Sequence, residues 1–420
     1  MGEREYLCID LKSYYASVEC VERGLDPLTA RLVVADPERT EKTICLAVSP
    51  ALKALGVPGR CRVFEIPKGL DYIMAPPRMS LYLRYSARIY GIYLRYVAPE
   101  DIHVYSVDEA FLDVTAYHRA RGMNVEEFAR AIMAEVLAET GITASCGIGS
   151  NLYLAKIAMD ILAKKSDDHL AALTEERYRS LLWDHRPITD FWMVAGGTAR
   201  RLESVGIRSM RGVAEADEAL LYRLFGVNAR FLIDHAWGRE STTMADIKAF
   251  RPATHSLSRG QVLTRDYGYE EGRIIVREMA EDLALEMFSK GLQTESVALN
   301  LGYAMHSLCR PVGGSVTLAE PTDSVRRLIE TAEQLYDRLM DPNAPIRRLT
   351  VGYGKLSLLE EDTQFSLFGD SAVRQRERRL TGAVLQIRDK YGKNGIFKGT
   401  NLLEGATGLE RNRQIGGHRA

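Results

Sequence analysis

The stretch Ile102–Val114 reads IHVYSVDEAFLDV, and the rest of the chain can be interpreted from it. Apolar and polar residues alternate as far as Val107, and the alternation resumes at Phe111. This period of two predicts a pair of strands that meet at a turn. Two adjacent acids, Asp108 and Glu109, stand between the strands, near the edge of the predicted sheet.

A third acid, Asp10, follows the apolar run Tyr6–Ile9, which predicts another strand. Together with Asp108 and Glu109 it supplies three carboxylates, and such hard oxygen ligands suit two divalent cations. Taken alone, the Asp108–Glu109 pair is more often a solvated turn. The choice between a metal site and a solvated turn therefore depends on the rest of the chain.

The composition is that of a globular protein with several domains. A chain of 420 residues predicts roughly three domains, and 46% of it is hydrophobic and 26% charged. No apolar run approaches the ~18 residues of a membrane span, and the N-terminus lacks signal-peptide character. Six cysteines without CxxC or zinc spacing predict reduced thiols in a cytoplasmic protein without a membrane partner. Neither an HExxH motif nor a Walker A loop occurs.

The junction GIGSNLYLAKIA, residues 147–158, joins a predicted strand to a predicted helix. Gly147 and Gly149 resemble a dinucleotide fingerprint, but Leu152 stands at its third glycine position and argues against one. Lys156 lies one turn inside the helix, where helix N–H groups and an ammonium could hold a phosphate. The spacing leaves a surface lysine equally open.

Two later segments are candidates for contact with nucleic acid. Residues 171–245 are predicted to be helical, and the stretch VAGGTARRLESVGI within them could present backbone N–H groups to a phosphodiester. An ordinary helical hairpin explains that stretch equally well. Residues 257–356 predict a β-α-β-β-α-β domain. The candidate DNA-binding residues of the two segments are Gly196, Gly197, Arg200, Arg201, Arg259, Arg310, Arg347 and Lys355.

The end of the chain has a different composition. The whole chain carries a net charge of −1, but residues 371–420 hold 11 Lys and Arg against 4 Asp and Glu, a net of 11 − 4 = +7. The peptide QFSLF has apolar anchors in a short polar segment, which is typical of a peptide that docks into a pocket. Residues 373–391 predict a basic amphipathic helix, and the Gly-rich sequence after it predicts partial disorder. The residues of the docking peptide are Gln364, Phe365, Ser366, Leu367 and Phe368.

In this order, these motifs resemble the Y-family translesion DNA polymerases, specifically the UmuC-like branch. IDLKSYYASVE, YSVDEAFLDVT and GIGSNLYLAKIA are similar to the family's three catalytic motifs, and SPALKALGVPGR is similar to its fingers motif. QFSLF is similar to the bacterial sliding-clamp-binding motif, with Phe365 in place of the usual leucine. The resemblance covers about residues 5–370.

The resemblance implies an α+β fold of the right-hand polymerase type. Its parts would be a ferredoxin-like palm (1–10 and 80–170), small fingers (11–79), a helical thumb with a helix-hairpin-helix-like turn (171–245), a split βαβ little finger (250–358) and a tail with the clamp-binding peptide and a partly disordered basic end (359–420).

The resemblance also implies the activity, an error-prone DNA polymerase that adds dNTPs to a primer 3′-hydroxyl opposite damaged template in DNA repair. Two Mg²⁺ ions would be held by the catalytic acids Asp10, Asp108 and Glu109 and by the Leu11 carbonyl. Tyr15 would be the steric gate that excludes ribonucleotides. The other nucleotide-binding residues would be Lys12, Ser13, Tyr14, Lys53 and Lys156. The implied partners are primer–template DNA, dNTP, a sliding clamp and a UmuD-type subunit.

Two other classes of function stay open at this point. Three carboxylates would equally serve another two-metal nucleotidyl enzyme on a related palm, such as a cyclase or nuclease. The other class is a non-catalytic accessory protein that binds DNA and the clamp. The intact acids and Lys156 argue against this accessory protein, and the thumb-like and little-finger-like segments argue against an enzyme with a small substrate.

Overall fold

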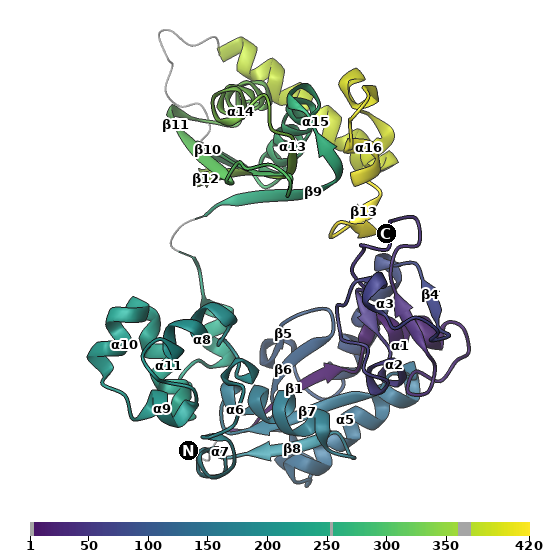
Figure 1. The fold of residues 1–420 in the computed structure, drawn as a ribbon, viewed down its shortest axis with the longest axis vertical. Helices are drawn as coiled ribbons and strands as arrows, with labels where there is room; N and C mark the ends of the chain where they lie inside the picture. Colours follow the sequence, from purple (N-terminus) through teal and green to yellow (C-terminus); the bar gives the residue numbers. More distant parts are fainter. Residues whose placement is uncertain (1–3, 253–254, 360–370) are drawn as a thin grey trace. The chain divides into compact units, whose positions relative to one another are not determined.

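A computed structural model describes residues 4–252, 255–359 and 371–420 of the chain. The chain forms two compact units, which divide between Phe250 and Arg251 and are described separately (Figure 1). No helix in these described ranges is both long and apolar enough to cross a membrane. The QFSLF peptide, residues 364–368, lies outside them.

The first unit is built on a five-stranded sheet, called here the central sheet, in the order β5-β6-β1-β7-β8. The central strand β1 pairs antiparallel with both β6 and β7, and β8 pairs parallel with β7. The hairpin predicted around Asp108 is therefore present, and the predicted strand at Tyr6 is the middle of the sheet. The bounds are β1 (Tyr6–Leu11), β5 (Ile102–Val104), β6 (Glu109–Asp113), β7 (Ala144–Gly149) and β8 (Leu170–Leu173). Because β8 joins this sheet, the sheet extends past the predicted palm boundary at residue 170.

Helices around the central sheet begin and end where their sequences dictate. The Asn124 side chain accepts a hydrogen bond from the backbone N–H of Glu127, and Gly141 ends the same helix with a φ of 69°. These residues encode both ends of the helix, as a capping box and a left-handed terminator. The helices are α3 (Met79–Tyr93), α4 (Tyr117–Ala120), α5 (Val125–Thr140) and α6 (Leu152–Ile157), and short turns form η2 (Pro99–Asp101), the π-helical turn η3 (Ala158–Leu162) and η4 (Ala163–Lys165).

A small module lies between β1 and α3 in the sequence. Its three-stranded sheet has the order β3-β2-β4 and a separate core that includes Val33, Cys45 and Leu52. The module therefore folds around its own apolar residues, as expected for an insertion. Its elements are α1 (Tyr14–Val21), β2 (Leu32–Val34), β3 (Ala47–Val48), α2 (Pro50–Ala54), η1 (Val63–Glu65) and β4 (Ile73–Ala75).

Helices complete the first unit, as predicted for residues after 171. Gly206 adopts a φ of 83° between α8 and α9, which makes the turn of a short helical hairpin. The last helix, α12, returns to the central sheet, where Met244 packs with Tyr6, Cys8 and Phe111. The bounds are α7 (Glu175–Leu182), η5 (Ile188–Asp190), α8 (Gly196–Glu203), α9 (Met210–Ala214), α10 (Glu218–Phe225), η6 (Gly226–Asn228), α11 (Ala229–Ala236) and α12 (Met244–Ala249).

The second unit has the predicted β-α-β-β-α-β order. Its antiparallel sheet has the strand order β11-β10-β12-β9, and α13 and α14 pack against it around a core that includes Ile275, Leu328 and Val351 (Figure 1). The predicted order of elements and the approximate limits of the domain, residues 257 and 356, agree with the structure. The elements are β9 (Leu257–Tyr267), α13 (Tyr269–Ser289), β10 (Leu292–Tyr303), β11 (Val312–Thr322), α14 (Val325–Leu339) and β12 (Ile346–Leu358).

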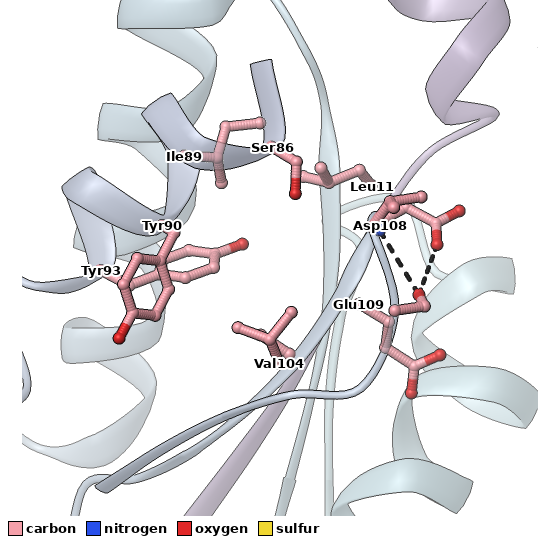
Figure 2. Close-up of a pocket in the computed structure, with 11 residues that line it drawn as sticks. Leu11, Ser86, Ile89, Tyr90, Tyr93, Val104, Asp108 and Glu109 are labelled. Carbon is pink, nitrogen blue, oxygen red and sulfur yellow. Dashed lines mark hydrogen bonds between the residues drawn. The ribbon is translucent and has the colours of Figure 1, made fainter. Parts of the chain in front are cut away.

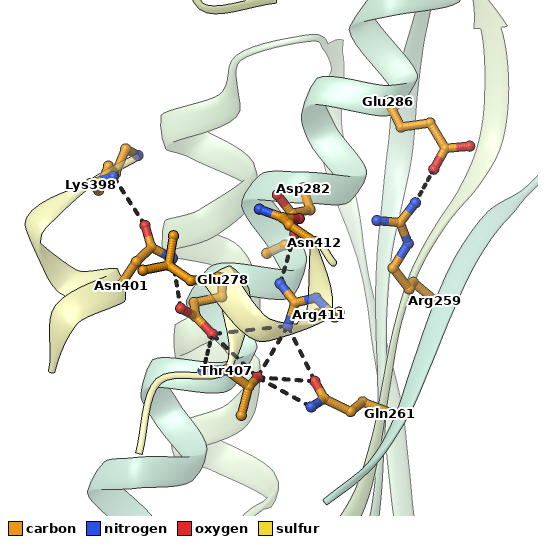
Figure 3. A network of polar contacts seen from close by, with 12 residues as sticks. Arg259, Gln261, Glu278, Asp282, Glu286, Lys398, Asn401, Thr407, Arg411 and Asn412 are labelled. Carbon is orange, nitrogen blue, oxygen red and sulfur yellow. Dashed lines mark hydrogen bonds and ion pairs between the residues drawn. The ribbon is translucent and has the colours of Figure 1, made fainter. Parts of the chain in front are cut away.

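The end of the chain is ordered against α13, so the prediction of partial disorder after residue 391 is wrong. Glu278 of α13 is 2% exposed and accepts hydrogen bonds from the Asn401 amide at 2.6 Å and from the Thr407 backbone N–H at 3.0 Å (Figure 3). Arg411 donates to Asp282 at 2.7 Å, and Arg388 donates to the same carboxylate at 3.2 Å. The elements are α15 (Ser371–Tyr391), η7 (Lys393–Gly395), η8 (Gly399–Leu402), α16 (Gly408–Arg411), β13 (Gln414–Ile415) and β14 (His418–Arg419).

These contacts explain the error. A Gly-rich basic sequence lacks the apolar residues to fold alone, which is the composition that suggests disorder. The order comes instead from acids on α13, which are more than a hundred positions away in the sequence and pair with the basic residues. We call Glu278, Glu281, Asp282, Arg388, Lys398 and Arg411, with their polar neighbours, the α13 network.

Candidate active site

Strand pairing places two of the predicted acids opposite each other. In the antiparallel pair of β1 and β6, Asp10 is the partner of Glu109. The backbone N–H of Leu11 donates to the carbonyl of Asp108 at 2.9 Å, which fixes the turn beside the end of β1. Because side chains alternate along a strand, Cys8, Asp10 and Glu109 share one face of the central sheet. The structure therefore gathers all three acids at one end of strands β1 and β6, which is called here the edge of the central sheet.

Asp108 is the acid at the turn itself. Its carboxylate accepts a hydrogen bond from the Ser106 hydroxyl at 2.6 Å (Figure 2). A small hollow beside Asp108 lies between α3 and the β5–β6 hairpin, and Tyr90, Tyr93 and Val104 line it. Asp108, Glu109 and Leu11 also line this hollow, whereas of the described residues neither Asp10 nor Tyr15 does, so the hollow adjoins only part of the acid group.

Burial and the neighbouring charged groups change the pKa of Asp10. Burial raises the pKa of Asp10 to about 6; nearby Lys164 opposes the rise, and the carboxylates of Asp108 and Glu109 add to it. Like charges opposite each other on antiparallel strands repel, and desolvation adds to the cost. An edge with this excess of negative charge favours a bound cation.

Lys156 is directed into this cluster. Its ammonium lies 2.7 Å from Glu109 and 2.9 Å from Asp160, and the residue is only 6% exposed. Burial lowers the pKa of Lys156, but the neighbouring Cys8, Asp160 and Glu109 raise it more, so it stays a cation. The alternative interpretation of Lys156 as a surface lysine is therefore excluded. Lys156 lies beside a catalytic candidate and is largely sealed from solvent.

Two glycines let the helix that carries Lys156 approach so closely. A Cβ at Gly147 would stand 2.1 Å from the Ala155 carbonyl oxygen, and one at Gly149 would stand 2.2 Å from the Ala155 nitrogen. Both contacts are with backbone, so α6 would have to move away from β7 to admit any side chain. The glycines that resembled a nucleotide-binding fingerprint are therefore required for helix–sheet packing.

Lys164 is a site residue that the sequence prediction missed. Its ammonium lies 3.4 Å from Asp10 and 2.9 Å from Asp160, and its side chain is 39% exposed. It is the more accessible of the two lysines at this edge. The available signal was spacing, because Lys156, Asp160 and Lys164 recur every four residues along one helical face.

The predicted nucleotide-binding residues after β1 lie around the start of α1. Ser13 precedes α1 with a φ of 48° and a ψ of 43°, a left-handed conformation that is uncommon outside glycine. Lys53 of the small module donates to the Ser13 hydroxyl at 2.9 Å, and the Lys12 ammonium lies 3.2 Å from the His169 ring. Burial lowers the pKa of Lys12 and that of Lys53. These two lysines and the strained turn are thus close to the end of β1.

The two tyrosines of this motif differ in exposure. Tyr14 is buried and donates to the Tyr82 carbonyl at 2.5 Å. Tyr15 is half-buried, and its ring stacks on that of Tyr82 with centroids 4.4 Å apart and an interplanar angle of 18°. The Tyr15 ring is therefore held in one orientation at the surface of α1.

The candidate DNA-binding residues divide into two groups. Gly196 and Gly197 begin α8 and are exposed, as are the side chains of Arg200 and Arg201 that follow on the same helix. In the second unit Arg310 and Lys355 are also exposed. Two others are already paired with acids, since Arg259 donates to Glu286 at 2.6 Å and Arg347 donates to Asp266 at 3.0 Å.

Comparisons with known proteins bear on what this edge does. Residues 9–160 match the model of the impB/mucB/samB family, and residues 254–367 match the C-terminal domain of that family. The UvrX protein of Bacillus subtilis, assigned to UV-damage repair, is 32% identical over 99% of this chain and 98% of its own length. DNA polymerase IV 2 of Halalkalibacterium halodurans is 30% identical over 98% of both chains.

The chain belongs to the Y family of translesion DNA polymerases. It is a DNA-directed DNA polymerase that acts in damage tolerance. A solved Y-family polymerase, a chimera of Dbh and Dpo4, matches this Y-family chain with a TM-score of 0.66 at 21% identity, over 84% of this chain and 99% of that one. The α+β polymerase fold is therefore confirmed.

Y-family relatives generally use divalent metal ions, and the donors of this polymerase fit such ions. Asp10, Asp108 and Glu109 offer carboxylate oxygens, the ligands that hard cations prefer. Over the described ranges, no three His, Cys, Asp or Glu side chains already converge as a complete metal-binding group. The carboxylate of Glu109 is instead engaged by Lys156 and by the Cys8 thiol at 3.3 Å.

Proposed function

We propose that this polymerase adds dNTPs to a primer 3′-hydroxyl opposite damaged template, with two Mg²⁺ ions bound at the edge of the central sheet. The observation that carries the proposal is the pairing of Asp10 with Glu109, with Asp108 held beside them by the hydrogen bond to Leu11. The ions would be held by these three acids and by the Leu11 carbonyl. When bound, they would lower the pKa of the primer hydroxyl and stabilise charge on the triphosphate.

Basic groups around Asp10 support a triphosphate at the same edge. Lys53 reaches Ser13 from the small module, the Lys12 ammonium lies 3.2 Å from the His169 ring, and Lys164 lies 3.4 Å from Asp10. The left-handed turn at Ser13 leaves the backbone N–H groups of Ser13 and Tyr14 as candidate donors to phosphate oxygens, whereas that of Lys12 donates to the Thr143 carbonyl at 2.9 Å. We assign the triphosphate to these basic and N–H groups near Asp10. Lys156 lies deeper, in contact with Glu109.

Tyr15 is proposed as the steric gate. A pocket that is merely apolar rejects an added hydroxyl weakly, so exclusion of a ribose 2′-hydroxyl needs a ring that cannot yield. Stacking on Tyr82 supplies that rigidity. Tyr15→Ala should raise ribonucleotide insertion relative to dNTP insertion by about tenfold or more. Tyr85→Ala, on the neighbouring helix α3, is the control, and unchanged sugar selectivity in Tyr15→Ala would remove the gate role.

The QFSLF peptide is proposed as a tether to the sliding clamp. A tether raises the local concentration of primer termini without changing the active site. Deletion of residues 364–368 should then reduce processivity only when clamp is present. An equal reduction without clamp would contradict this role.

Primer extension on undamaged and abasic templates tests the proposal as a whole. Wild-type protein with Mg²⁺ and four dNTPs should extend distributively and cross the lesion. Asp108→Ala should abolish extension and keep DNA binding, because it removes one cation ligand at the turn and no contact in the core. Synthesis retained by Asp108→Ala would contradict the two-metal assignment.

A further inference from the structure

Asp160 has no role in the mechanism proposed above, yet it lies at the centre of the charges around β1 and β6. Its carboxylate is 2.9 Å from the Lys156 ammonium and 2.9 Å from the Lys164 ammonium. Lys156 continues to Glu109 at 2.7 Å, and Lys164 continues to Asp10 at 3.4 Å. Asp160 is therefore the common partner of the two lysines that contact the paired acids.

The local sequence explains why one acid reaches both lysines. Residues four apart on a helix lie on the same face, and Asp160 is four positions from Lys156 and four from Lys164. The carboxylate falls inside the π-helical turn η3, and such single turns within helices frequently occur at functional sites. Because α6 lies directly on β7, the whole row of three charges is held against the sheet.

The two lysines differ in what Asp160 can do for them. The Lys156 side chain is 8% exposed and already has Glu109 as a second partner, so it is fixed by its surroundings. The Lys164 side chain is 39% exposed, and a lysine at a surface has many rotamers to lose when it binds a ligand. Its contact with Asp160 is the shorter of its two ion pairs. Asp160 thus has its larger effect on Lys164.

We infer that Asp160 is a positioning residue for nucleotide binding, which holds Lys164 beside Asp10 with its ammonium ready for the triphosphate. This inference rests on the proposed function, which assigns the triphosphate to this edge. When a nucleotide arrives, Lys164 exchanges its long contact with Asp10 for a phosphate oxygen and keeps its contact with Asp160. The ordering of the side chain is then complete before binding, which improves affinity without a new contact.

Single-nucleotide insertion by the full-length protein tests this role. Asp160→Asn keeps the shape and removes the charge, and it should raise the KM for dNTP about tenfold, the effect of one lost charge-assisted contact. The kcat should change less than about threefold, and Asp160→Glu should give an intermediate KM. Asp160→Asn should add little in a Lys164→Ala background, because the two changes remove one interaction. Glu175→Gln is the control, since it breaks the 3.5 Å pair with Arg179 on α7 at the same spacing.

A second readout does not depend on turnover. The Kd of dNTP for the polymerase on a 3′-dideoxy-terminated primer should rise about tenfold in Asp160→Asn, while the Kd for DNA stays unchanged. A dNTP Kd within twofold of wild type overturns the inference, as does full additivity with Lys164→Ala. If Asp160→Asn does not fold, an unchanged dNTP Kd in Asp160→Glu overturns it. A wild type that binds dNTP without extending primers would contradict the proposed function, and the binding comparison would still decide the role of Asp160.

Discussion

The acids at the edge of the central sheet and the α13 network in the second unit are both partly buried clusters of opposite charges. At the edge, four carboxylates (Asp10, Asp108, Glu109 and Asp160) lie near two ammonium groups (Lys156 and Lys164). In the α13 network, three carboxylates (Glu278, Glu281 and Asp282) meet three cations (Arg388, Lys398 and Arg411). Among these groups, which leave out Lys12 and Lys53 at the turn after β1, the first cluster has an excess of negative charge, and the second is balanced.

This difference in charge distinguishes a binding site from a structural contact. The contact of the α13 network with the end of the chain is called here the clasp. Uncompensated carboxylates in a buried place are unfavourable until a cation joins them, so the edge carries a cost that bound metal removes. In the α13 network each acid is neutralised, and Arg411 and Asn401 also satisfy hydrogen bonds, which holds the end of the chain on α13 (Figure 3). Part of the positive charge of the last 50 residues is therefore neutralised by acids of α13.

The largest expected contrast is in activity. Glu109→Gln keeps the volume and removes a cation ligand, so extension should fall about 1,000-fold or more, which corresponds to about 4 kcal/mol of transition-state stabilisation. The fold should be retained, because Lys156 keeps Asp160 as a partner. Primer-extension rates and circular dichroism would measure both. Activity within tenfold of wild type would mean that Glu109 serves only to neutralise Lys156.

The opposite result is expected in the α13 network. Glu278→Ala removes the acceptor of the Asn401 amide and of the Thr407 backbone N–H, while Arg411 keeps Asp282, and two hydrogen bonds to a buried carboxylate together contribute about 3–5 kcal/mol. Amide hydrogen exchange should rise in α13 and in residues 399–415, with the central sheet unaffected. Glu330→Gln on α14, which makes only a 3.9 Å surface contact, is the matched control. Unchanged protection of residues 399–415 in Glu278→Ala would show that the clasp depends on other contacts.

Ionised Asp10 is expected to destabilise the folded protein, whereas Glu278 of the α13 network is expected to stabilise it. The folded state raises the pKa of Asp10 from 3.8 to about 6, so it binds the proton more tightly than the unfolded chain does. The stability that Asp10 contributes should therefore be full below about pH 4 and decrease as the pH rises through 6, by about 3 kcal/mol in total. Asp10→Asn should remove this decrease and make the protein more stable than wild type at pH 7.5 in EDTA.

Urea denaturation at pH 4 and pH 7.5 would measure the effect of Asp10→Asn. Asp71→Asn, at an exposed position in the small module, supplies the control. A wild type that is equally stable at both pH values relative to Asp10→Asn would show that Lys164 already compensates Asp10.

Much of this comparison was predictable from local sequence. The alternation around Asp108, the apolar run before Asp10 and the caps Asn124 and Gly141 all encode features within a few residues of themselves. The first two were interpreted correctly, as was the β-α-β-β-α-β order of the second unit. Periodicity and capping are local properties, so they survive without knowledge of the fold.

The missed features depend on contacts between distant segments. Lys164 lies near Asp10 because glycines in β7 allow α6 to pack against the sheet. In the sequence, the four-residue spacing of Asp160 and Lys164 is no different from that of charged residues on an ordinary exposed helix. The order of residues 392–420 depends on acids in α13. Likewise, Arg259 and Arg347 looked available for DNA, but each is paired with an acid that only the fold brings near.

The smallest effect is expected where a glycine of the tail meets α13. A Cβ at Gly408 would stand 2.7 Å from a Glu278 carboxylate oxygen and 2.8 Å from the Asn401 amide, both ends of flexible side chains. Gly408→Ala should therefore cost about 1–2 kcal/mol locally, less than the loss of Glu278, because these groups can shift. Gly382→Ala on α15 is the control of opposite sign, since nothing lies within 4 Å and alanine favours a helix by about 1 kcal/mol. Hydrogen exchange of residues 399–415 would compare the two, and equal protection in both variants would show that the clasp tolerates looser packing than its hydrogen bonds suggest.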